Sequence, residues 1–250
     1  MEPPPRSSAV SDAVRVENAT KVFGEGDTRV TALDDLSLSF ERGKFTAIMG
    51  PSGSGKSTLL HCIAGLDLLT DGCVYIGEVC LNELSDKQLT LLRREKVGFI
   101  FQSFNLIPTL DASENITLPV DIAGKDHDAA WFDTVVDTVG LRDRLTHRPS
   151  ELSGGQQQRV AAARALVSRP EIIFADEPSG NLDSKSSAEL LGFMRRAVDE
   201  FGQTIVMVTH DANAASYADR VVFLADGKQS GELLDPTTDR ILEYLKSLGD

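Results

Sequence analysis

The sequence has 250 residues, of which 41% are apolar, and this is enough to bury the core of one large domain or of one domain with a subdomain. Its net charge of −13 and isoelectric point near 4.7 argue against a nucleic-acid partner and against simple electrostatic adhesion to anionic lipid, because both need a basic face. No apolar run approaches the roughly 20 residues that span a bilayer, so we expect any membrane role to come through a partner.

The N-terminal residues and the cysteines bear on location. The chain starts MEPPPRSS, which has no apolar segment and does not match a signal peptide. The proline content predicts a disordered tail over residues 1–13. Cys62, Cys73 and Cys80 show no C-x-x-C spacing and are odd in number, so we interpret them as reduced, partly buried thiols and not as a metal or redox site. These features predict a cytoplasmic protein.

From residue 14 onward, strand and helix patterns alternate. Strand patterns lie at 14–22, 36–40, 45–49, 97–101, 171–175, 204–208 and 221–225. Most are continuous apolar runs, which indicates strands covered on both faces, as in a parallel sheet. Helix patterns lie at 56–65, 86–95, 153–168, 185–201 and 236–248, with Ser85 and Ser153 at the starts of two of them. The alternation predicts an α/β fold.

The middle of the chain differs from the rest. Residues 108–150 contain helical patterns, such as the one at 128–139, and no convincing strand. We interpret this part as a helical subdomain, covering about 108–165, inserted into a single domain that runs from residue 14 to residue 250.

Residues 50–58 read GPSGSGKST and match the phosphate-loop motif G-x-x-x-x-G-K-[S/T] between a strand pattern and a helix pattern. Glycines let the backbone curl so that N–H groups point inward, and the helix that follows adds its positive dipole end. The Lys56 ammonium can reach the β- and γ-phosphates, and the Ser57 hydroxyl can ligate Mg²⁺. The motif therefore predicts a nucleoside triphosphate site formed by Gly50, Ser52, Gly53, Ser54, Gly55, Lys56, Ser57 and Thr58.

A second motif, IIFADE at 172–177, delivers Asp176 and Glu177 at the carboxyl end of a strand pattern. Ligands of open α/β sheets bind at that edge. We predict that Asp176 holds the Mg²⁺ shell and that Glu177 polarises the attacking water as general base. An isolated acidic pair would more often end a strand in solvent, and the phosphate loop in the same chain favours the catalytic interpretation.

Residues 152–156 read LSGGQ between these two motifs, and here the sequence resembles the ABC ATPase family, over essentially the whole chain after about residue 14. The pentapeptide is similar to the family's signature sequence, and SGNLD at 179–183 to its D-loop. Gln102 follows a strand as in the Q-loop, and His210 follows TIVMVT like the switch histidine. The resemblance implies a P-loop NTPase (RecA-like) core with an antiparallel β subdomain and an inserted α-helical subdomain.

The same resemblance implies ATP and Mg²⁺ as ligands and assigns roles to particular residues. Phe23 stands where the family places a ring against adenine. The implied catalytic residues are Glu177, His210, Gln102 and Lys56. The implied metal ligands are Ser57, Gln102 and Asp176, and the implied phosphate contacts of the signature are Ser153, Gly154, Gly155 and Gln156. Taken singly, Phe23 could be core, Gln102 a loop amide and His210 a surface histidine.

The signature should open a helix whose free N–H groups form a second phosphate-binding end. The helical subdomain separates this end from the phosphate loop of the same chain. The resemblance implies a head-to-tail homodimer in which Ser153 and Gly155 act in trans. Closure would then depend on the γ-phosphate, and hydrolysis would release it. Outside this set, we expect no catalytic role for His61, His127, His147, Arg159 or Arg164.

Several segments resemble one subfamily, the ATPases of macrolide exporters, lipoprotein-releasing complexes and the cell-division transporter. They are AGLD at 64–67, GFIFQSFNLIP at 98–108, SENITLPV at 113–120, and DEPSGNLDS, in which Ser179 replaces a frequent threonine. This implies a separate permease, with four transmembrane helices and a large extracytoplasmic domain, and a peripheral location on the cytoplasmic face of the plasma (inner) membrane. A helix of the permease would dock on Phe101, Phe104, Leu106 and Ile107, unless these four only fill the seam between core and subdomain.

Rival functions fit less well. A DNA-repair or chromosome-organising ATPase needs a long coiled coil between phosphate loop and signature, but only about a hundred residues without heptads intervene. A translation-factor-like protein carries two ATPase units, and a pure binding module would not need Glu177, Gln102 and His210. The ATPase of an importer for amino acids or other small solutes differs only in its partner and stays as the alternative. The transported substrate and its direction belong to the permease.

Overall fold

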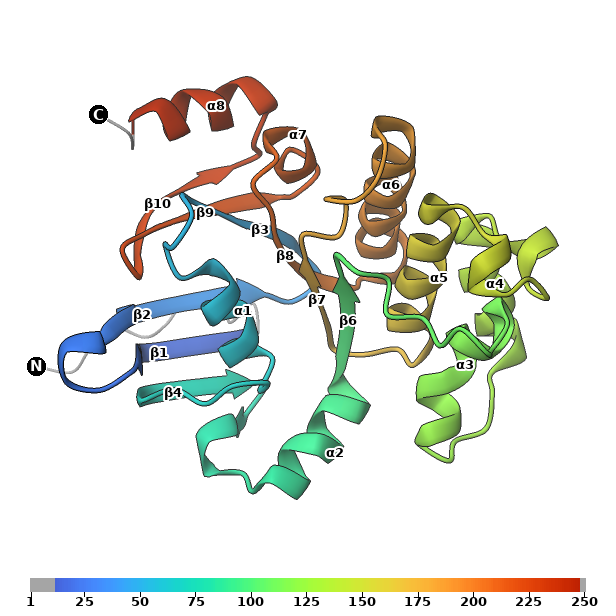
Figure 1. The fold of residues 1–250 in the computed structure, drawn as a ribbon, viewed down its shortest axis with the longest axis horizontal. Helices are drawn as coiled ribbons and strands as arrows, with labels where there is room; N and C mark the ends of the chain where they lie inside the picture. Colours follow the sequence, from blue (N-terminus) through green and yellow to red (C-terminus); the bar gives the residue numbers. More distant parts are fainter. Residues whose placement is uncertain (1–11, 248–250) are drawn as a thin grey trace, which may run out of the picture.

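The computed structural model describes residues 12–247, which form two β-sheets with helices around them (Figure 1). One sheet is antiparallel, in the order β2-β1-β4-β5, with β1 (Asp12–Phe23), β2 (Val30–Glu41), β4 (Asp71–Ile76) and β5 (Val79–Cys80). The other has the order β10-β9-β3-β8-β7-β6, with β3 (Phe45–Met49), β6 (Val97–Phe101), β7 (Ile172–Asp176), β8 (Thr204–Val208), β9 (Arg220–Ala225) and β10 (Lys228–Leu234). In this second sheet only the edge strand β10 is antiparallel to its neighbour.

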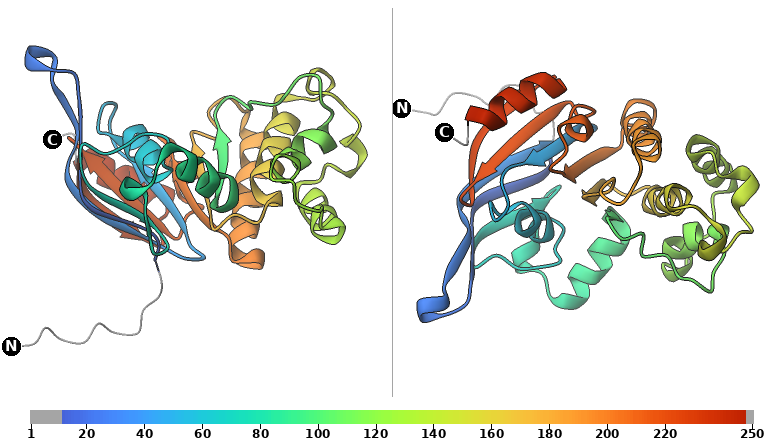
Figure 2. Two further views of the ribbon diagram at one scale, coloured as in Figure 1. Left: turned by 90° about the horizontal axis from the view of Figure 1, so that it is seen from below. Right: turned by 45° about the horizontal axis from the view of Figure 1, so that its top comes forward.

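The α-helices are α1 (Lys56–Ile63), α2 (Asp86–Lys96), α3 (Ala112–Ile122), α4 (Ala129–Val139), α5 (Gly154–Val167), α6 (Ser184–Phe201), α7 (Ala212–Ala215) and α8 (Thr238–Ser247). Short 3₁₀ turns are η1 (Gly26–Thr28), η2 (Leu81–Glu83), η3 (Arg142–Arg144) and η4 (Pro149–Glu151). Helices α3, α4 and α5 gather at the end of the molecule opposite the antiparallel sheet (Figures 1 and 2). Among residues 12–247, none of the helices combines the length and apolar character that crossing a bilayer demands.

The inner strands of the mixed sheet are buried on both faces, as their apolar continuity predicts. In β7, Ile173 and Ala175 pack toward the helices, while Ile172 and Phe174 pack toward α1 and the antiparallel sheet. The other inner strands alternate in the same way, so the sheet separates two apolar cores. Because β3 lies in the middle of this sheet, the loop that follows it starts from a rigid base.

The α/β class, the antiparallel sheet and every expected strand and helix are present, and their ends agree within about two residues except that β2 begins at Val30, well before the expected residue 36. Strands β4, β5 and β10 carried no clear pattern in the sequence. The expected tail reached residue 13, but Asp12 and Ala13 lie in β1, where the Ala13 carbonyl accepts a hydrogen bond from Gly77 N at 2.9 Å. The remainder of that prediction lies outside the described residues.

Both expected N-caps are present. Ser85 and Gln88 form a capping box before α2, in which Ser85 N donates to Gln88 Oε1 at 3.0 Å. Ser153 caps α5 by accepting a bond from Gln156 N at 3.3 Å, and Ser153 N donates to Gln156 Oε1 at 2.8 Å. The signature glycines therefore lie in the first turn of a well-formed helix.

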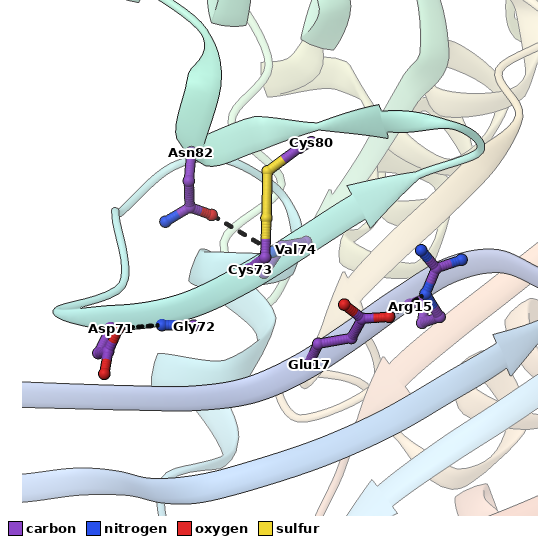
Figure 3. Close-up of a disulfide and its surroundings, with 8 residues drawn as sticks. All are labelled: Arg15, Glu17, Asp71, Gly72, Cys73, Val74, Cys80 and Asn82. Atoms are coloured by element: carbon purple, nitrogen blue, oxygen red, sulfur yellow. Dashed lines mark hydrogen bonds and ion pairs between the residues drawn. A yellow bond between two sulfur atoms is a disulfide. The ribbon is translucent and has the colours of Figure 1, made fainter.

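The prediction of three reduced cysteines is wrong. Cys73 of β4 and Cys80 of β5 form a disulfide across this hairpin, and Asn82 beside it accepts a bond from Val74 N (Figure 3). Only Cys62 is free, and it is buried in α1, where burial raises the pKa of its thiol to about 12. Disulfides persist mainly in oxidising surroundings, so the cysteines do not support a reducing compartment.

Candidate functional site

The loop after β3 is shaped by contacts that only glycine allows. A Cβ atom on Gly50 would lie 2.1 Å from the Leu224 carbonyl oxygen, and one on Gly55, whose φ is +96°, would lie 2.3 Å from the Ala32 carbonyl oxygen. Ser54 supports the loop from inside, because its carbonyl accepts a bond from Gly227 N at 3.2 Å. Residues 50–55 are therefore curled tightly against β2 and the β9–β10 turn.

The same loop offers donors to an anion. The first N–H groups of α1, those of Lys56, Ser57 and Thr58, have no partner within the helix. Ser54 Oγ is buried and has no hydrogen-bond partner among the described residues. Lys56 Nζ lies over the loop, donating to the carbonyls of Gly50 at 2.9 Å and Pro51 at 2.7 Å. Such a cradle of N–H groups with one ammonium fits the phosphates of a nucleotide.

Two carboxylates at the end of β7 lie within electrostatic range of Lys56. Burial lowers the pKa of Lys56, whereas the charges of Glu177 and Asp176 act in the opposite direction. Burial also raises the pKa of Asp176, with the Glu177 charge adding to the rise and His61 and Lys56 opposing it. The phosphate loop and the acidic pair, far apart in the sequence, thus lie close enough to interact through their charges.

Glu177 is held in an unusual backbone conformation. Its φ is +47°, in the left-handed region that non-glycine residues seldom adopt. Its N–H donates to the Val208 carbonyl at 3.0 Å, which fixes the residue to the end of β8. His210 also follows β8, and its Nδ1 lies 2.9 Å from the Glu177 carboxylate. The His210 side chain is 74% exposed and that of Glu177 only 22%, so the imidazole covers the carboxylate on the solvent side.

Gln102 follows β6 and lies against the segment 179–183. Its carbonyl accepts a bond from Asn181 Nδ2 at 3.1 Å, and its Nε2 lies 3.4 Å from Asn181 Oδ1. A Cβ on Gly180 would come within 2.8 Å of Gln102 Nε2, so a larger residue there would require the Gln102 amide to move. Asn181 belongs to the SGNLD motif, but nothing in the sequence marked it as the partner of Gln102.

The signature residues lie apart from the phosphate loop and the groups around Glu177. Ser153 through Gln156 form the start of α5, and strands β6 and β7 of the mixed sheet lie between that helix and α1 (Figure 1). Gly155 packs against α6, since a Cβ there would lie 2.4 Å from Ser186 Oγ. The structure thus brings Lys56, Asp176, Glu177 and His210 together, whereas the signature lies elsewhere in the fold.

Phe23 ends β1 with 43% of its surface exposed, and Lys21 Nζ lies 4.9 Å from the centre of its ring. An exposed ring at a strand end is available for stacking, and the adenine role stays a prediction. Of the arginines on α5, Arg159 forms an ion pair with Glu189. Arg164 donates to the carbonyls of Phe104 at 3.0 Å and Asn105 at 2.6 Å, and burial lowers its pKa. Both arginines therefore make structural contacts.

The donor set fits Mg²⁺ only in company with a nucleotide. Among residues 12–247, no three His, Cys, Asp or Glu side chains gather as a resident metal site would require. The expected ligands are one hydroxyl, one carboxylate and one amide, from Ser57, Asp176 and Gln102. Magnesium is commonly held by one or two protein groups and completed by phosphate oxygens and water, which this set allows.

A hollow of about 400 Å³ lies between β6 and α3, beside the expected docking residues. It is lined by apolar groups that include Phe99, Phe101 and Pro119, with the 64%-exposed Ile122 at its rim. Leu106 packs partly against the core, whereas Ile107 is 38% exposed. Residues of this seam thus fill space between core and helices and also present apolar surface.

Comparisons with known proteins agree with this geometry. The profile of the family described as "ABC transporter" matches residues 33–180, more than half of the chain. The chain is 43% identical over 226 residues to the "Uncharacterized ABC transporter ATP-binding protein MJ0796" of Methanocaldococcus jannaschii, covering 88% of this chain and 96% of that protein. It is 45% identical over 233 residues to the "Macrolide export ATP-binding/permease protein MacB" of Bdellovibrio bacteriovorus, covering 90% of this chain but 35% of that protein.

A solved structure shares the fold. It is described as a dimeric, post-hydrolysis state of the ATP-binding cassette MJ0796 bound to ADP and Pi, and it matches with a TM-score of 0.80 and 41% identity, covering 90% of this chain and 99% of that one. The family profile, two relatives above 40% identity and this match all agree. The chain therefore belongs to the ABC transporter family, as one of its ATP-binding domains.

Proposed function

We propose that this chain is the ATP-binding subunit of an ABC transporter, and that it hydrolyses ATP with Glu177 as general base to drive a separate membrane permease. The observation that carries the proposal is the Glu177 carboxylate, held 2.9 Å from His210 Nδ1 and close enough to Lys56 for their charges to interact. A base beside a phosphate cradle is what attack of water on a γ-phosphate requires.

Each group has a step in this mechanism. The free N–H groups of the loop and of the start of α1, together with the Lys56 ammonium, would bind the β- and γ-phosphates. Ser57, Asp176 and Gln102 would hold Mg²⁺, and the ion would neutralise phosphate charge. Glu177 accepts the proton of the attacking water, and His210 Nδ1–H orients the Glu177 carboxylate. A protonated His210 can use Nε2–H to donate to the γ-phosphate at the same time.

The nucleotide would lie between two copies of the chain. The signature helix lies away from its own phosphate loop (Figures 1 and 2), and this supports contacts in trans from Ser153, Gly154, Gly155 and Gln156. The relative bound to ADP and Pi is dimeric, which also supports a head-to-tail homodimer. Because both chains would contact the γ-phosphate, ATP would close the dimer and hydrolysis would reopen it.

The partner would be a permease of the exporter or mechanotransmission type. The chain spans about a third of the MacB proteins that it matches, and their name includes a permease. We infer a separate permease with four transmembrane helices and a large extracytoplasmic domain, contacted at the cytoplasmic face of the inner membrane through Phe101, Phe104, Leu106 and Ile107. The macrolide-export relatives favour this partner over an importer permease. The division into a tail, a domain from residue 14 and a helical subdomain at about 108–165 belongs to the same proposal.

Replacing Glu177 by glutamine tests the catalytic part. Glu177→Gln keeps the shape of the side chain but cannot accept the proton of water, so ATP should still bind while turnover falls by about 100-fold or more. The trapped dimer should then elute as such in size-exclusion chromatography with Mg-ATP. Lys56→Ala is the control and should lose binding and the dimer together. Native turnover by Glu177→Gln would show that another group is the base.

The partner is tested with the same variant. Tagged Glu177→Gln, incubated with native membranes and Mg-ATP, is recovered, and its bound proteins are identified by mass spectrometry. A four-helix membrane protein with a large outer domain is expected. A six-helix permease with a solute-binding protein would establish the importer alternative, and recovery of soluble partners alone would contradict any transport role.

A further inference from the structure

We propose that Gln158 is a positioning residue for hydrolysis, which holds the segments bearing Gln102 and Glu177 at a fixed separation; this rests on the proposed ATPase function. Gln158 lies on α5 and is completely buried. Its Nε2 donates to the Phe101 carbonyl at 3.0 Å and to the Pro178 carbonyl at 2.6 Å. Phe101 directly precedes Gln102, and Pro178 directly follows Glu177.

The hydrogen-bond inventory of this amide indicates a role beyond stability. The NH₂ group of glutamine has two N–H bonds, and here they serve two different segments. Its Oε1 is buried without a partner among the described residues, which costs stability. An apolar side chain of similar length would avoid that cost, but it would leave the Phe101 and Pro178 carbonyls without this donor. The presence of an amide at this position is therefore explained by the two segments that its N–H groups hold in place.

Both held segments need such restraint. Glu177 occupies the left-handed region, and its carbonyl accepts a bond from Gly180 N at 3.0 Å in the turn that follows. Asn181, in that turn, bonds in addition to Gln102. Gln158 joins the two segments from inside the protein and Asn181 joins them from the surface. Gln158 cannot touch the reacting atoms from its buried place, so it acts through the position of Glu177 and Gln102.

Gln203 provides a matched control. It is also buried, 7% exposed, and its Nε2 also donates to two backbone carbonyls, those of Pro170 at 3.1 Å and Thr204 at 3.2 Å. These bonds lie at the amino ends of β7 and β8, at the edge of the sheet opposite the catalytic groups. The same substitution at either glutamine removes two bonds from a side-chain amide to backbone carbonyls, at opposite ends of the sheet strands.

The experiment compares Gln158→Met with Gln203→Met in the full chain. We expect Gln158→Met to lower kcat about tenfold or more while the KM for ATP stays within about twofold, because the phosphate loop is not touched. Gln203→Met should keep kcat within about twofold, even if it lowers the urea midpoint of unfolding as much as Gln158→Met does. Hydrogen exchange should become faster at 102–104 and 177–182 in the first variant only.

The outcomes are distinct. Equal kcat values for the two variants, or no local change in exchange, would overturn the positioning role while the wild-type rate still supports the ATPase proposal. Absence of turnover in the wild-type chain would overturn the ATPase proposal and this role with it. Should Gln158→Met not fold, Gln158→Asn replaces it under the same criteria, because it keeps both N–H groups but is one methylene too short to serve both carbonyls.

Discussion

Asp176 and Glu177 are neighbours in the sequence, but the fold gives them different surroundings. Glu177 bonds to His210 in a strained backbone conformation, whereas Asp176 ends β7 and is half-buried, and this burial raises its pKa. A half-buried carboxylate that forms no ion pair within residues 12–247 destabilises the apo protein. Asp176 is thus suited to a ligand that supplies the missing positive charge, as the proposed Mg²⁺ would.

This leads to a prediction about pH. The folded chain binds a proton at Asp176 at a higher pH than the unfolded chain, so the unfolding free energy falls as pH rises from the ordinary pKa of 3.8 through the raised one. Asp176→Asn should therefore raise the urea midpoint at pH 7, and the gain should vanish near pH 3.8. Asp183→Asn is the control. Hydrogen bonds from Ser186 lower the pKa of Asp183, so this substitution should lower the urea midpoint at pH 7. A midpoint for Asp176→Asn that does not depend on pH would contradict the argument.

At the scale of elements, the sequence predicted those strands, helices and motifs that a local pattern of residues determines. Strands buried on both faces gave continuous apolar runs, and the phosphate loop and IIFADE were marked by their order along the chain. The edge strand β10 and the short hairpin β4–β5 are polar or brief, and their pairing depends on tertiary contacts. The disulfide, the Gln102–Asn181 contact and the bonds of Gln158 join residues whose spacing predicts nothing, so only the structure reveals them.

Packing between α5 and β6 allows a second prediction. Gly98 lies in β6, and a Cβ there would come within 2.6 Å of the Ala165 carbonyl oxygen, so α5 rests directly on the strand. Gly98→Ala should lower the unfolding free energy by about 1–3 kcal/mol through overpacking. Gly192→Ala on α6 is the control: the nearest atom is Arg196 Nη1 at 3.8 Å, and a gain of about 0.5–1 kcal/mol is expected from helix propensity. Urea unfolding measures both, and an unaffected Gly98→Ala would show that α5 can shift freely.

At the scale of the whole molecule, the dominant feature is charge. Each chain carries −13, and two chains must approach closely in the proposed dimer. Salt shortens the range of this repulsion, from about 30 Å near 10 mM to about 10 Å near 100 mM. Closure would therefore have to overcome a long-range repulsion, which the phosphate contacts alone do not remove.

We thus expect the dimer of Glu177→Gln with Mg-ATP to become tighter as NaCl rises from about 10 to about 100 mM. Analytical ultracentrifugation gives the dimer Kd at each concentration. Lys56→Ala should stay monomeric throughout, which controls for salt-induced association. A dimer that weakens with salt would mean that local attraction across the interface outweighs the net charge.

The disulfide of the β4–β5 hairpin also decides how the chain can be labelled. It removes Cys73 and Cys80 from reaction with maleimides, and Cys62 is buried with a thiol pKa of about 12. The native chain should therefore take up no label without a reductant. One cysteine introduced on the surface would then be a unique attachment point for a fluorophore or spin probe, and two labelled copies would report the opening and closing of a dimer as a change in a single distance.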